Sequence, residues 1–420
     1  MSEKLPTINA SSIAQVVNAG LCIGCGLCES LTKRQVTMQM TPEGTLRPAP
    51  IDGFDVADET LLLSVCPGIH IRPRQQSDLP VNANTSTKAA CPPNYAMDDI
   101  WGEYASMQYA WAADPEVRYK GSTGGVLNAL GRHLLNSHQA AFIYQVKADP
   151  QAPIRSIATM SETAEDVMND TASRYGPVAP LTGLLQALDR NEPFAVIAKP
   201  CDLSAIHNYA AHDERVNKLI SHRLVMVCGG QSTEQKARDL LHASNIKPQN
   251  VTLYRHRGYG NPGPTRVESN DGKIVEISYQ ELWKDESSWG IESRCKLCPD
   301  ALGEASDIAA ADVWPGGSPV GEDEGFNGIV VRTDTGSNLV ASAVDAGELV
   351  LGEKISVEQF NDFQPHQVNK KIALQARYQG LADVGAPQIH APESRLEILG
   401  KRLNSDEAKN ERAGTARRFK

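Results

Sequence analysis

The apolar positions of the chain predict strands and helices that alternate from about residue 120 to residue 310. Residues 194–198 and 224–227 are short, continuous apolar runs, a pattern typical of strands covered on both faces. Apolar residues recur on one helical face within 126–135. Strands that alternate with helices favour an α/β fold with a largely parallel core. The further expected elements are strands at 140–147, 153–160 and 305–314, and helices at 11–20, about 180–190 and 233–243.

A different pattern follows residue 251. A formal Gly-x-Gly-x-x-Gly motif spans residues 258–263, but Pro262 lies inside it and Pro264 directly after it. Residues 265–278 are typical of a strand, a turn and a second strand. The dinucleotide-binding fingerprint requires a helix at this place, so we reject that interpretation. A basic, Gly-rich loop that contains Arg255, His256 and Arg257 could still hold a cofactor pyrophosphate. The alternative is a solvated hairpin loop.

Composition narrows the classes of function. The chain has 420 residues, 41% of them apolar, which suits a globular protein of two or three domains. A net charge of −10 argues against nucleic-acid binding, which needs a basic face. No apolar run reaches the roughly 18–20 residues that cross a bilayer, and the N-terminus has no apolar secretory segment. We therefore expect a cytoplasmic protein that binds neither nucleic acid nor a membrane.

Nine cysteines carry the strongest chemical signal. Cys22, Cys25 and Cys28 follow a CxxCxxC spacing, and a distal Cys66 precedes a proline, as in the cluster loop of bacterial ferredoxins. In a reducing compartment such cysteines bind metal rather than form disulfides. We assign these four to one [4Fe–4S] cluster. The alternative is structural zinc, which usually shows two separated CxxC pairs. Cys91, in a Pro- and Asn-rich stretch, is expected to be uninvolved.

A second set of four cysteines lies later in the chain. Cys201 and Cys228 each follow one of the two buried apolar runs, and Cys295 and Cys298 form a CxxC. The ends of neighbouring strands converge beside a cleft, which makes them a rigid place for a site. Four thiolates are the number that a cubane cluster needs. The sequence therefore predicts a second [4Fe–4S] cluster.

A Gly-Ser-Thr-Gly-Gly loop at 121–125 opens directly into the helix expected at 126–135. The free N–H groups and positive dipole end of such a helix can bind a phosphate. The loop is not a Walker A motif, because no Gly-Lys-Ser/Thr follows. The alternative is an ordinary Gly-rich turn with Ser122 or Thr123 as the N-cap.

Together these motifs resemble the coenzyme F420 hydrogenase/dehydrogenase beta-subunit family over roughly residues 100–380. With the cysteine-rich front end, the layout is most similar to the 7-hydroxymethyl chlorophyll a reductase branch. The sequence departs from the family pattern at Thr123, Asp202, His207 and residues 228–230. The substrate pocket is therefore not identified from the family pattern. The matching segments are 121–125, 199–201, 227–228, 257–263, 295–298, 306–312 and 366–371 with Arg377.

The resemblance implies a flavoprotein that binds FAD, with the cluster of Cys201, Cys228, Cys295 and Cys298 near the flavin. Family members exchange hydride between FAD and the deazaflavin F420, or use electrons from ferredoxin to reduce an organic substrate. The residues that we assign to the cofactor are Ser122, Thr123, Gly124, Gly125, Tyr175, Lys199, Pro200, Arg257, Gly258 and Gly260.

The expected fold class is α/β, with α+β in places, in four parts. A ferredoxin-like [4Fe–4S] module and its linker occupy 1–90, a unit with the FAD loop 100–190, a unit with the second cluster 191–345, and a helical tail 346–420. Residues 72–100 are expected to be a linker. The charge runs of the tail are expected to be solvated helix faces, and its last twenty residues are given no function.

Three functions remain at this stage. The leading hypothesis is a reductase that passes electrons from ferredoxin, or a similar low-potential carrier, through two [4Fe–4S] clusters to FAD and on to a small organic substrate. The alternative is an electron-transfer beta subunit that exchanges hydride with F420 and relays electrons to a partner dehydrogenase. The third is a non-redox zinc protein. Homo-oligomerisation stays open.

His256 and Asp202 are the candidates for proton transfer. Both lie beside the expected cofactor motifs and carry groups that can titrate usefully. The alternative for each is structural hydrogen bonding.

Overall fold

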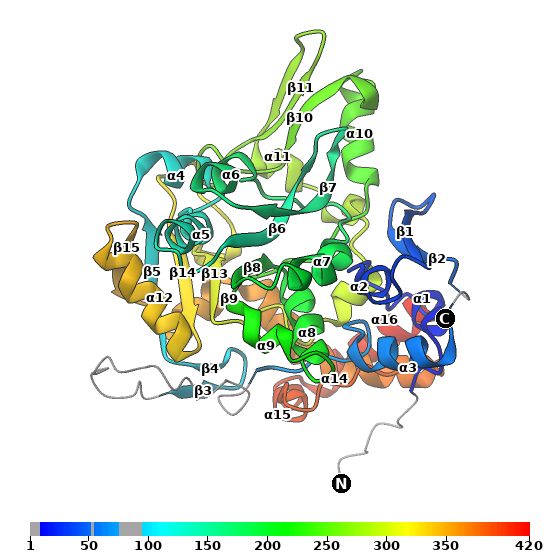
Figure 1. The fold of residues 1–420 in the computed structure, drawn as a ribbon. Coiled ribbons are helices and arrows are strands. Elements are labelled where there is room, and N and C mark those ends of the chain that lie inside the picture. The colour runs from blue at the N-terminus through cyan, green and yellow to red at the C-terminus, as the bar shows by residue number, and fades with distance from the viewer. Residues whose placement is uncertain (1–8, 52–53, 75–94) are drawn as a thin grey trace.

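The computed structural model in Figure 1 describes residues 9–51, 54–74 and 95–420. At its centre is an eight-stranded sheet with the strand order β15-β5-β14-β13-β9-β8-β6-β7. The linker segment 75–94, including Cys91, lies outside the described residues. The strands of the sheet are β5 (Ser106–Ala112), β6 (Phe142–Asp149), β7 (Ala152–Ser161), β8 (Phe194–Ala198), β9 (Ile220–Met226), β13 (Ile308–Asp312), β14 (Asn327–Val331) and β15 (Leu349–Lys354).

The sheet is mixed. Its four inner strands β6, β8, β9 and β13 are parallel neighbours, as the alternation of strands and helices predicts. The outer strands β7, β14, β5 and β15 join antiparallel, so the prediction of a largely parallel core is wrong for them. At one edge the physical reason is local: β6 and β7 form a tight hairpin in which Asp149 pairs with Ala152, and a tight turn can join only antiparallel strands.

Helices cover both faces of the sheet (Figure 1). The apolar side chains of strand β8 show the two layers directly. Phe194, Val196 and Ala198 belong to one buried cluster, whereas Ala195 and Ile197 belong to the other. On one face lie α4 (Pro115–Lys120), α5 (Val126–Asn136), α6 (Ala164–Asn169) and α12 (Asp334–Asp345); on the other lie η2 (Pro180–Gly183), α7 (Leu184–Asp189), α8 (Pro200–Tyr209), α9 (Arg215–Leu219) and α13 (Val357–Phe363).

A small unit projects from the sheet, at the top of Figure 1. It is a three-stranded antiparallel sheet with its own apolar cluster. A strand follows Gly263, so the rejection of a dinucleotide-binding fingerprint is confirmed. The elements of this unit are α10 (Gln235–Ala243), η3 (Pro248–Asn250), β10 (Val251–Arg255), β11 (Thr265–Ser269), β12 (Ile274–Ile277) and α11 (Tyr279–Trp283).

The N-terminal segment packs against the C-terminal helices. Leu21 and Ile69 share one buried cluster with Leu374, Tyr378 and Leu381 of the long helix α14 (Pro365–Asp383). The elements of the N-terminal segment are α1 (Ile13–Asn18), α2 (Leu27–Leu31), β1 (Thr37–Met40), β2 (Leu46–Ala49) and α3 (Val56–Val65); β3 (Ala96–Asp98) and β4 (Gly102–Tyr104) then lead to the sheet.

The C-terminal tail is helical, as predicted, but not uniformly solvated. It contains α14 (Pro365–Asp383), α15 (Leu396–Gly400) and α16 (Ser405–Phe419). Most of α16 is exposed, whereas α14 buries polar as well as apolar side chains, including Gln367 and Lys371. The expectation of solvated faces is therefore wrong for α14, because its polar side chains find partners inside the protein. Within the described residues, no helix is both long and apolar enough to cross a membrane.

Candidate functional site

Four cysteines surround one cavity near the carboxyl ends of the parallel strands. Cys201 lies in the first turn of α8, directly after β8, and Cys228 follows the neighbouring strand β9. Cys295 lies in the short helix η5 (Ser293–Leu297), with Cys298 directly after it. The lining of the cavity contains all four, together with Ile23, Lys199, Pro200, Gly230, Gln231, Asp300, Ala301 and Lys370. We call Cys201, Cys228, Cys295 and Cys298 the inner set.

The other four described cysteines form a second group in the N-terminal segment. Cys28 lies in α2, and Cys66 follows the end of α3. The thiols interact electrostatically with one another: Cys25 with Cys28 and Cys66, and Cys22 with Cys28 and Cys66. We call Cys22, Cys25, Cys28 and Cys66 the outer set.

Both sets are electrostatically suited to a cation. Burial raises the pKa of Cys66 and of Cys295 to about 12, and neighbouring cysteines contribute in the same direction. Several thiols crowded into a desolvated space cannot all ionise unless positive charge compensates them. Thiolates are the ligands of iron–sulfur clusters and of zinc, so bound metal would supply that charge.

Backbone N–H groups point at sulfur in each set. Gly24 N–H donates to Cys22 Sγ at 3.4 Å, and Gln231 N–H donates to Cys295 Sγ at 3.4 Å. Gly24 has φ +70°, a conformation that glycine adopts readily, and a Cβ there would lie 2.8 Å from Leu46 O. Such N–H···S contacts favour a negatively charged sulfur and tune the potential of a bound cluster.

The spacing of the ligands bears on the choice between zinc and a cluster. Among the described residues, no three His, Cys, Asp or Glu side chains converge closely enough to hold a single metal ion. Four cysteines on one zinc all lie about 2.3 Å from it, so their sulfurs are close neighbours. A cubane distributes four thiolates over four irons and needs a wider cage.

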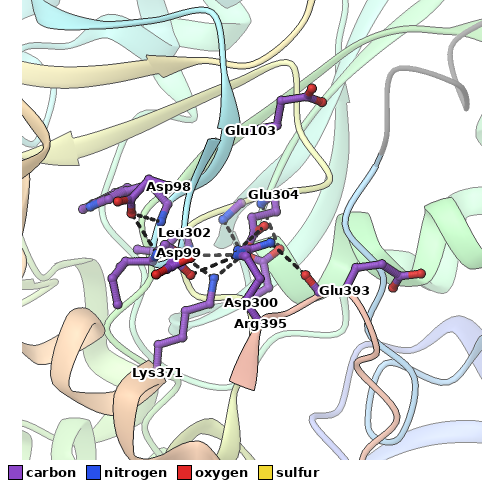
Figure 2. A network of polar contacts seen from close by, with 12 residues as sticks. Asp98, Asp99, Glu103, Asp300, Leu302, Glu304, Lys371, Glu393 and Arg395 are labelled. Carbon is purple, nitrogen blue, oxygen red and sulfur yellow. Dashed lines mark hydrogen bonds and ion pairs between the residues drawn. The ribbon is translucent and has the colours of Figure 1, made fainter. Parts of the chain in front are cut away.

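A buried polar network fixes the loop that follows the inner CxxC (Figure 2). The carboxylate of Asp300 accepts from the N–H groups of Leu302, Gly303 and Glu304 at 2.7–3.0 Å. Cys228 N–H donates to Ala301 O at 2.9 Å, so the same loop supports the inner set.

The predicted Gly-rich loop lies at the start of α5. Gly125 is the N-cap of the helix, with φ +68°. Asn327 Oδ1 accepts from Gly124 N–H at 3.0 Å and from Val126 N–H at 3.3 Å. A phosphate at this helix end would have to displace the Asn327 amide.

The second predicted cofactor loop, at 257–263, lies beside the first. Arg257 donates to Ser122 O at 2.9 Å, and Gly260 N–H donates to Tyr119 O at 3.0 Å. Gly258 and Gly260 have φ of +105° and +124°, and a Cβ at Gly258 would lie 2.6 Å from Lys120 O. The structure therefore brings the 121–125 and 257–263 segments together. Lys199 and Pro200 lie instead at the inner cysteine cavity.

Asp312 organises the place where these loops meet. Its carboxylate accepts from both terminal nitrogens of Arg257, at 3.0 and 3.1 Å, and contacts the Thr123 hydroxyl. Arg257 also reaches the Tyr175 hydroxyl at 3.5 Å and lies 4.7 Å from the Trp314 ring centroid. Ser122, Thr123, Tyr175 and Arg257 thus belong to one polar cluster with Asp312.

An aromatic cluster adjoins Arg257, and reasoning from the sequence missed it. Trp283 and Trp289 stack with ring centroids 3.9 Å apart, and the ring of Tyr175 lies edge-on to both. Among the described residues, several buried polar atoms of this region have no hydrogen-bond partner, namely Tyr254 Oη, His256 Nδ1, Trp283 Nε1, Trp289 Nε1 and Trp314 Nε1. Buried polar atoms are normally satisfied, so this region departs from the usual pattern. The available signal was that three of the five tryptophans lie between residues 283 and 314.

His256 lies inside this aromatic cluster rather than in an open cleft. It is 3% exposed and packs against the rings of Tyr175 and Tyr254. Burial, with a smaller effect of Arg174, lowers the pKa of its imidazole to about 3. The ring is therefore neutral at pH 7.

The depressed pKa of His256 predicts a pH-dependent stability. The unfolded chain protonates this residue near pH 6.5, whereas the folded chain does so only near pH 3. The unfolded state binds the extra proton, so the free energy of unfolding should fall as the pH decreases below 6.5. His256→Gln should remove about 2 kcal/mol of the decrease between pH 7.5 and pH 5, measured by denaturant unfolding. His242→Gln, at an exposed position of α10, is the matched control. An unchanged pH slope in the His256 variant would contradict the burial argument.

Asp202, the other candidate for proton transfer, is paired with a lysine. Its carboxylate lies 2.9 Å from Lys199 Nζ, and both residues border Cys201 at the inner set. Burial alone would lower the pKa of Lys199, but the combined effect of Asp202, Cys201 and Cys228 outweighs burial and raises it. The geometry supports a structural ion pair beside the inner set.

Comparison with known families matches the central part of the chain. Two models, both described as coenzyme F420 hydrogenase/dehydrogenase, beta subunit, align with it: the N-terminal model matches residues 107–186, and the C-terminal model matches residues 191–356. Together they cover more than half of the chain. The inner set and both predicted cofactor loops lie within the match, whereas the outer set precedes it.

Two curated relatives are beta subunits. The F420-dependent formate dehydrogenase 1 subunit beta of Methanococcus maripaludis is 24% identical over 243 residues, which are 57% of this chain and 60% of that subunit. The coenzyme F420 hydrogenase subunit beta of Methanococcus voltae is 24% identical over 293 residues, 67% of this chain and 98% of that subunit. A chain of the F420-reducing [NiFe] hydrogenase complex from Methanosarcina barkeri superposes with a TM-score of 0.52 at 17% identity, covering 66% of this chain and 92% of that one. This last likeness shows the fold alone.

Proposed function

The chain belongs to the coenzyme F420 hydrogenase/dehydrogenase beta-subunit family, and from this premise we propose that it is an electron-transfer subunit that exchanges hydride with F420 and relays electrons to a partner dehydrogenase. The observation that carries the proposal is the cavity lined by Cys201, Cys228, Cys295 and Cys298 within the family-matched region. Both curated relatives are named as beta subunits of F420 enzymes, which favours this function over the ferredoxin-dependent reductase that leads the sequence analysis.

The proposed cofactors are two [4Fe–4S] clusters and one FAD. The clusters would carry single electrons, and the flavin would exchange them for a hydride. The outer and inner cysteine sets would hold the clusters. For FAD, the support is the meeting of the 121–125 and 257–263 loops around Arg257, next to the unpartnered aromatic donors.

The residues of this chain prepare the flavin site in two ways. Asp312 positions Arg257 and offsets most of its positive charge, so the guanidinium would act on a developing negative charge chiefly as a hydrogen-bond donor. The stacked Trp283 and Trp289 rings and the buried His256 limit access of water to the same region. The neutral imidazole of His256 can donate or accept one hydrogen bond but is a poor base.

A specific observation supports a second candidate function. The outer set, with its ferredoxin-type spacing, lies in the chain itself and precedes the family match. A chain that carries the outer set in addition to the inner set could receive electrons from a ferredoxin-like protein. It could then reduce a small organic substrate without a dehydrogenase partner.

The test begins with anaerobic purification and measurement of iron, acid-labile sulfide and released flavin. We expect about eight iron, eight sulfide and one FAD per chain. Reduced F420 is then mixed with the protein and a viologen dye; each F420 oxidised should reduce two dye molecules. Rapid dye reduction supports the F420 function. No reaction with F420, together with turnover of an organic substrate by reduced ferredoxin, would establish the second candidate. Zinc without flavin would overturn both.

A further inference from the structure

One residue, Gln231, forms hydrogen bonds with the loops of both cysteine sets. Its side-chain amide donates to Ile23 O at 3.3 Å, and Ile23 lies between the outer ligands Cys22 and Cys25. Its backbone N–H donates to Cys295 Sγ at 3.4 Å. Ile23 itself lines the inner cavity, so the outer loop closes one side of the inner site.

An ion pair reinforces the same contact. Arg47, from β2 of the N-terminal segment, binds the Glu292 carboxylate through two hydrogen bonds of 2.7 and 3.1 Å. The Arg47 side chain is 15% exposed and the Glu292 side chain 4%. Glu292 N–H donates to Gln231 O at 3.0 Å, and Cys295 N–H donates to Glu292 O at 2.9 Å. We call Arg47, Gln231 and Glu292 the joint.

The charges of the joint act on both sets. The Arg47 guanidinium interacts electrostatically with Cys22 of the outer set and with Cys295 of the inner set. Glu292 also acts on Cys22, with the opposite sign. Because the pair is largely buried, solvent and salt screen it less than an ion pair on the surface.

We propose that the Arg47–Glu292 pair, held in place by Gln231, sets the reduction potentials of the outer and inner clusters together. The proposal rests on the proposed function only in requiring that both cysteine sets hold clusters. Arg47 and Glu292 are positioning residues, since they act through the cysteines. While the pair is intact, its charges largely cancel. Removal of one partner leaves an uncompensated charge near both sets.

The sign of the effect follows from electrostatics. Reduction adds one negative charge to a cluster, so a neighbouring positive charge favours the reduced form. Glu292→Gln leaves Arg47 uncompensated and should shift both potentials upward. Arg47→Gln leaves Glu292 uncompensated and should shift both downward. The double variant Arg47→Gln/Glu292→Gln should lie near the wild type.

The experiment is an anaerobic redox titration followed by electron paramagnetic resonance, with iron content measured on every sample. Cys201→Ala protein identifies the signal of the outer cluster. Arg266→Met, which removes a partly exposed charge from β11, is the control for net charge and should shift neither potential. Shifts of both clusters in the stated directions, cancelled in the double variant, support the proposal.

Other outcomes would test whether the Arg47–Glu292 pair sets both reduction potentials. A shift of one cluster alone, or shifts no larger than in Arg266→Met, would overturn it while leaving the proposed function intact. If both single variants lost iron, recovery of iron and of wild-type potentials in the double variant would support the proposal, and failure to recover them would overturn it. Wild-type protein with about four iron would overturn both the joint and the proposed cofactor set.

Discussion

Cys201→Ala protein is expected to retain about half of the iron of the wild type, with the inner cluster lost and the outer cluster present. The physical reason is that each cubane depends on its own four thiolates. Cys201 lies at the inner cavity, on a helix that follows the central strand β8, whereas the outer set lies in the N-terminal segment. Iron and sulfide analysis, with absorbance near 400 nm, measures the loss: about four of eight iron should remain.

Two matched variants make this result specific. Cys22→Ala should remove the outer cluster and leave the inner one, the reciprocal pattern. Cys91→Ala should leave the iron content unchanged, because the two sets use the other eight cysteines. Complete retention of iron in Cys201→Ala would rule out the inner site, and complete loss would mean that the two sets do not assemble independently.

The candidate site could be anticipated from sequence where the signal is local. CxxCxxC and CxxC are short spacings, and the loop that they require also requires Gly24 at φ +70°. The proximity of Cys201 and Cys228, which are far apart in the sequence, could also be predicted. Each follows a continuous apolar run, and such runs are buried strands whose ends meet when the strands are parallel neighbours, as β8 and β9 are.

What the sequence could not supply are contacts between distant segments. Strands β14, β5 and β15 extend the parallel centre through successive antiparallel pairings, and nothing in their own patterns specifies the neighbour. The same holds for the aromatic cluster, where Tyr175 meets Trp283 and Trp289 more than 100 residues later. The expectation of a solvated helix is wrong for α14, because a polar sequence does not show which of its side chains have partners inside the protein.

The function, too, could be predicted only in part from the sequence. Motif order was enough to predict the family, and the family models match the region that carries those motifs. The choice between a self-contained reductase and a subunit of a larger enzyme depends on which surface receives electrons. The ferredoxin-type spacing of the outer set drew the interpretation toward ferredoxin, whereas the relatives of the central region are subunits of F420 enzymes.

Lys371→Met is expected to destabilise the protein by about 3–5 kcal/mol, the usual consequence of removing one partner from a buried ion pair. Lys371 and Glu304 are 3% and 4% exposed and contact each other directly. The ammonium also donates to Ile100 O at 2.5 Å, and Arg395 binds the same glutamate at 2.7 Å (Figure 2). Burial would raise the pKa of Glu304, but Lys371, Arg395 and Arg332 outweigh it and hold the pKa at about 2. Without Lys371 the pKa of Glu304 should rise, because burial is then opposed only by Arg395 and Arg332.

The effect should extend to the inner set, because Glu304 belongs to the loop that Asp300 organises directly after Cys298. Denaturant unfolding should therefore show both a lower midpoint by circular dichroism and an earlier loss of cluster absorbance. Arg402→Met is the matched control: Arg402 pairs with Asp99 at 2.8 Å, but the two side chains are 44% and 39% exposed. A pair that solvent reaches contributes less than about 1 kcal/mol, so this variant should remain close to wild type. Equal effects of the two variants would mean that burial of the Lys371–Glu304 pair is not what makes it important, and that α14 is held to the inner-set loop by its apolar contacts instead.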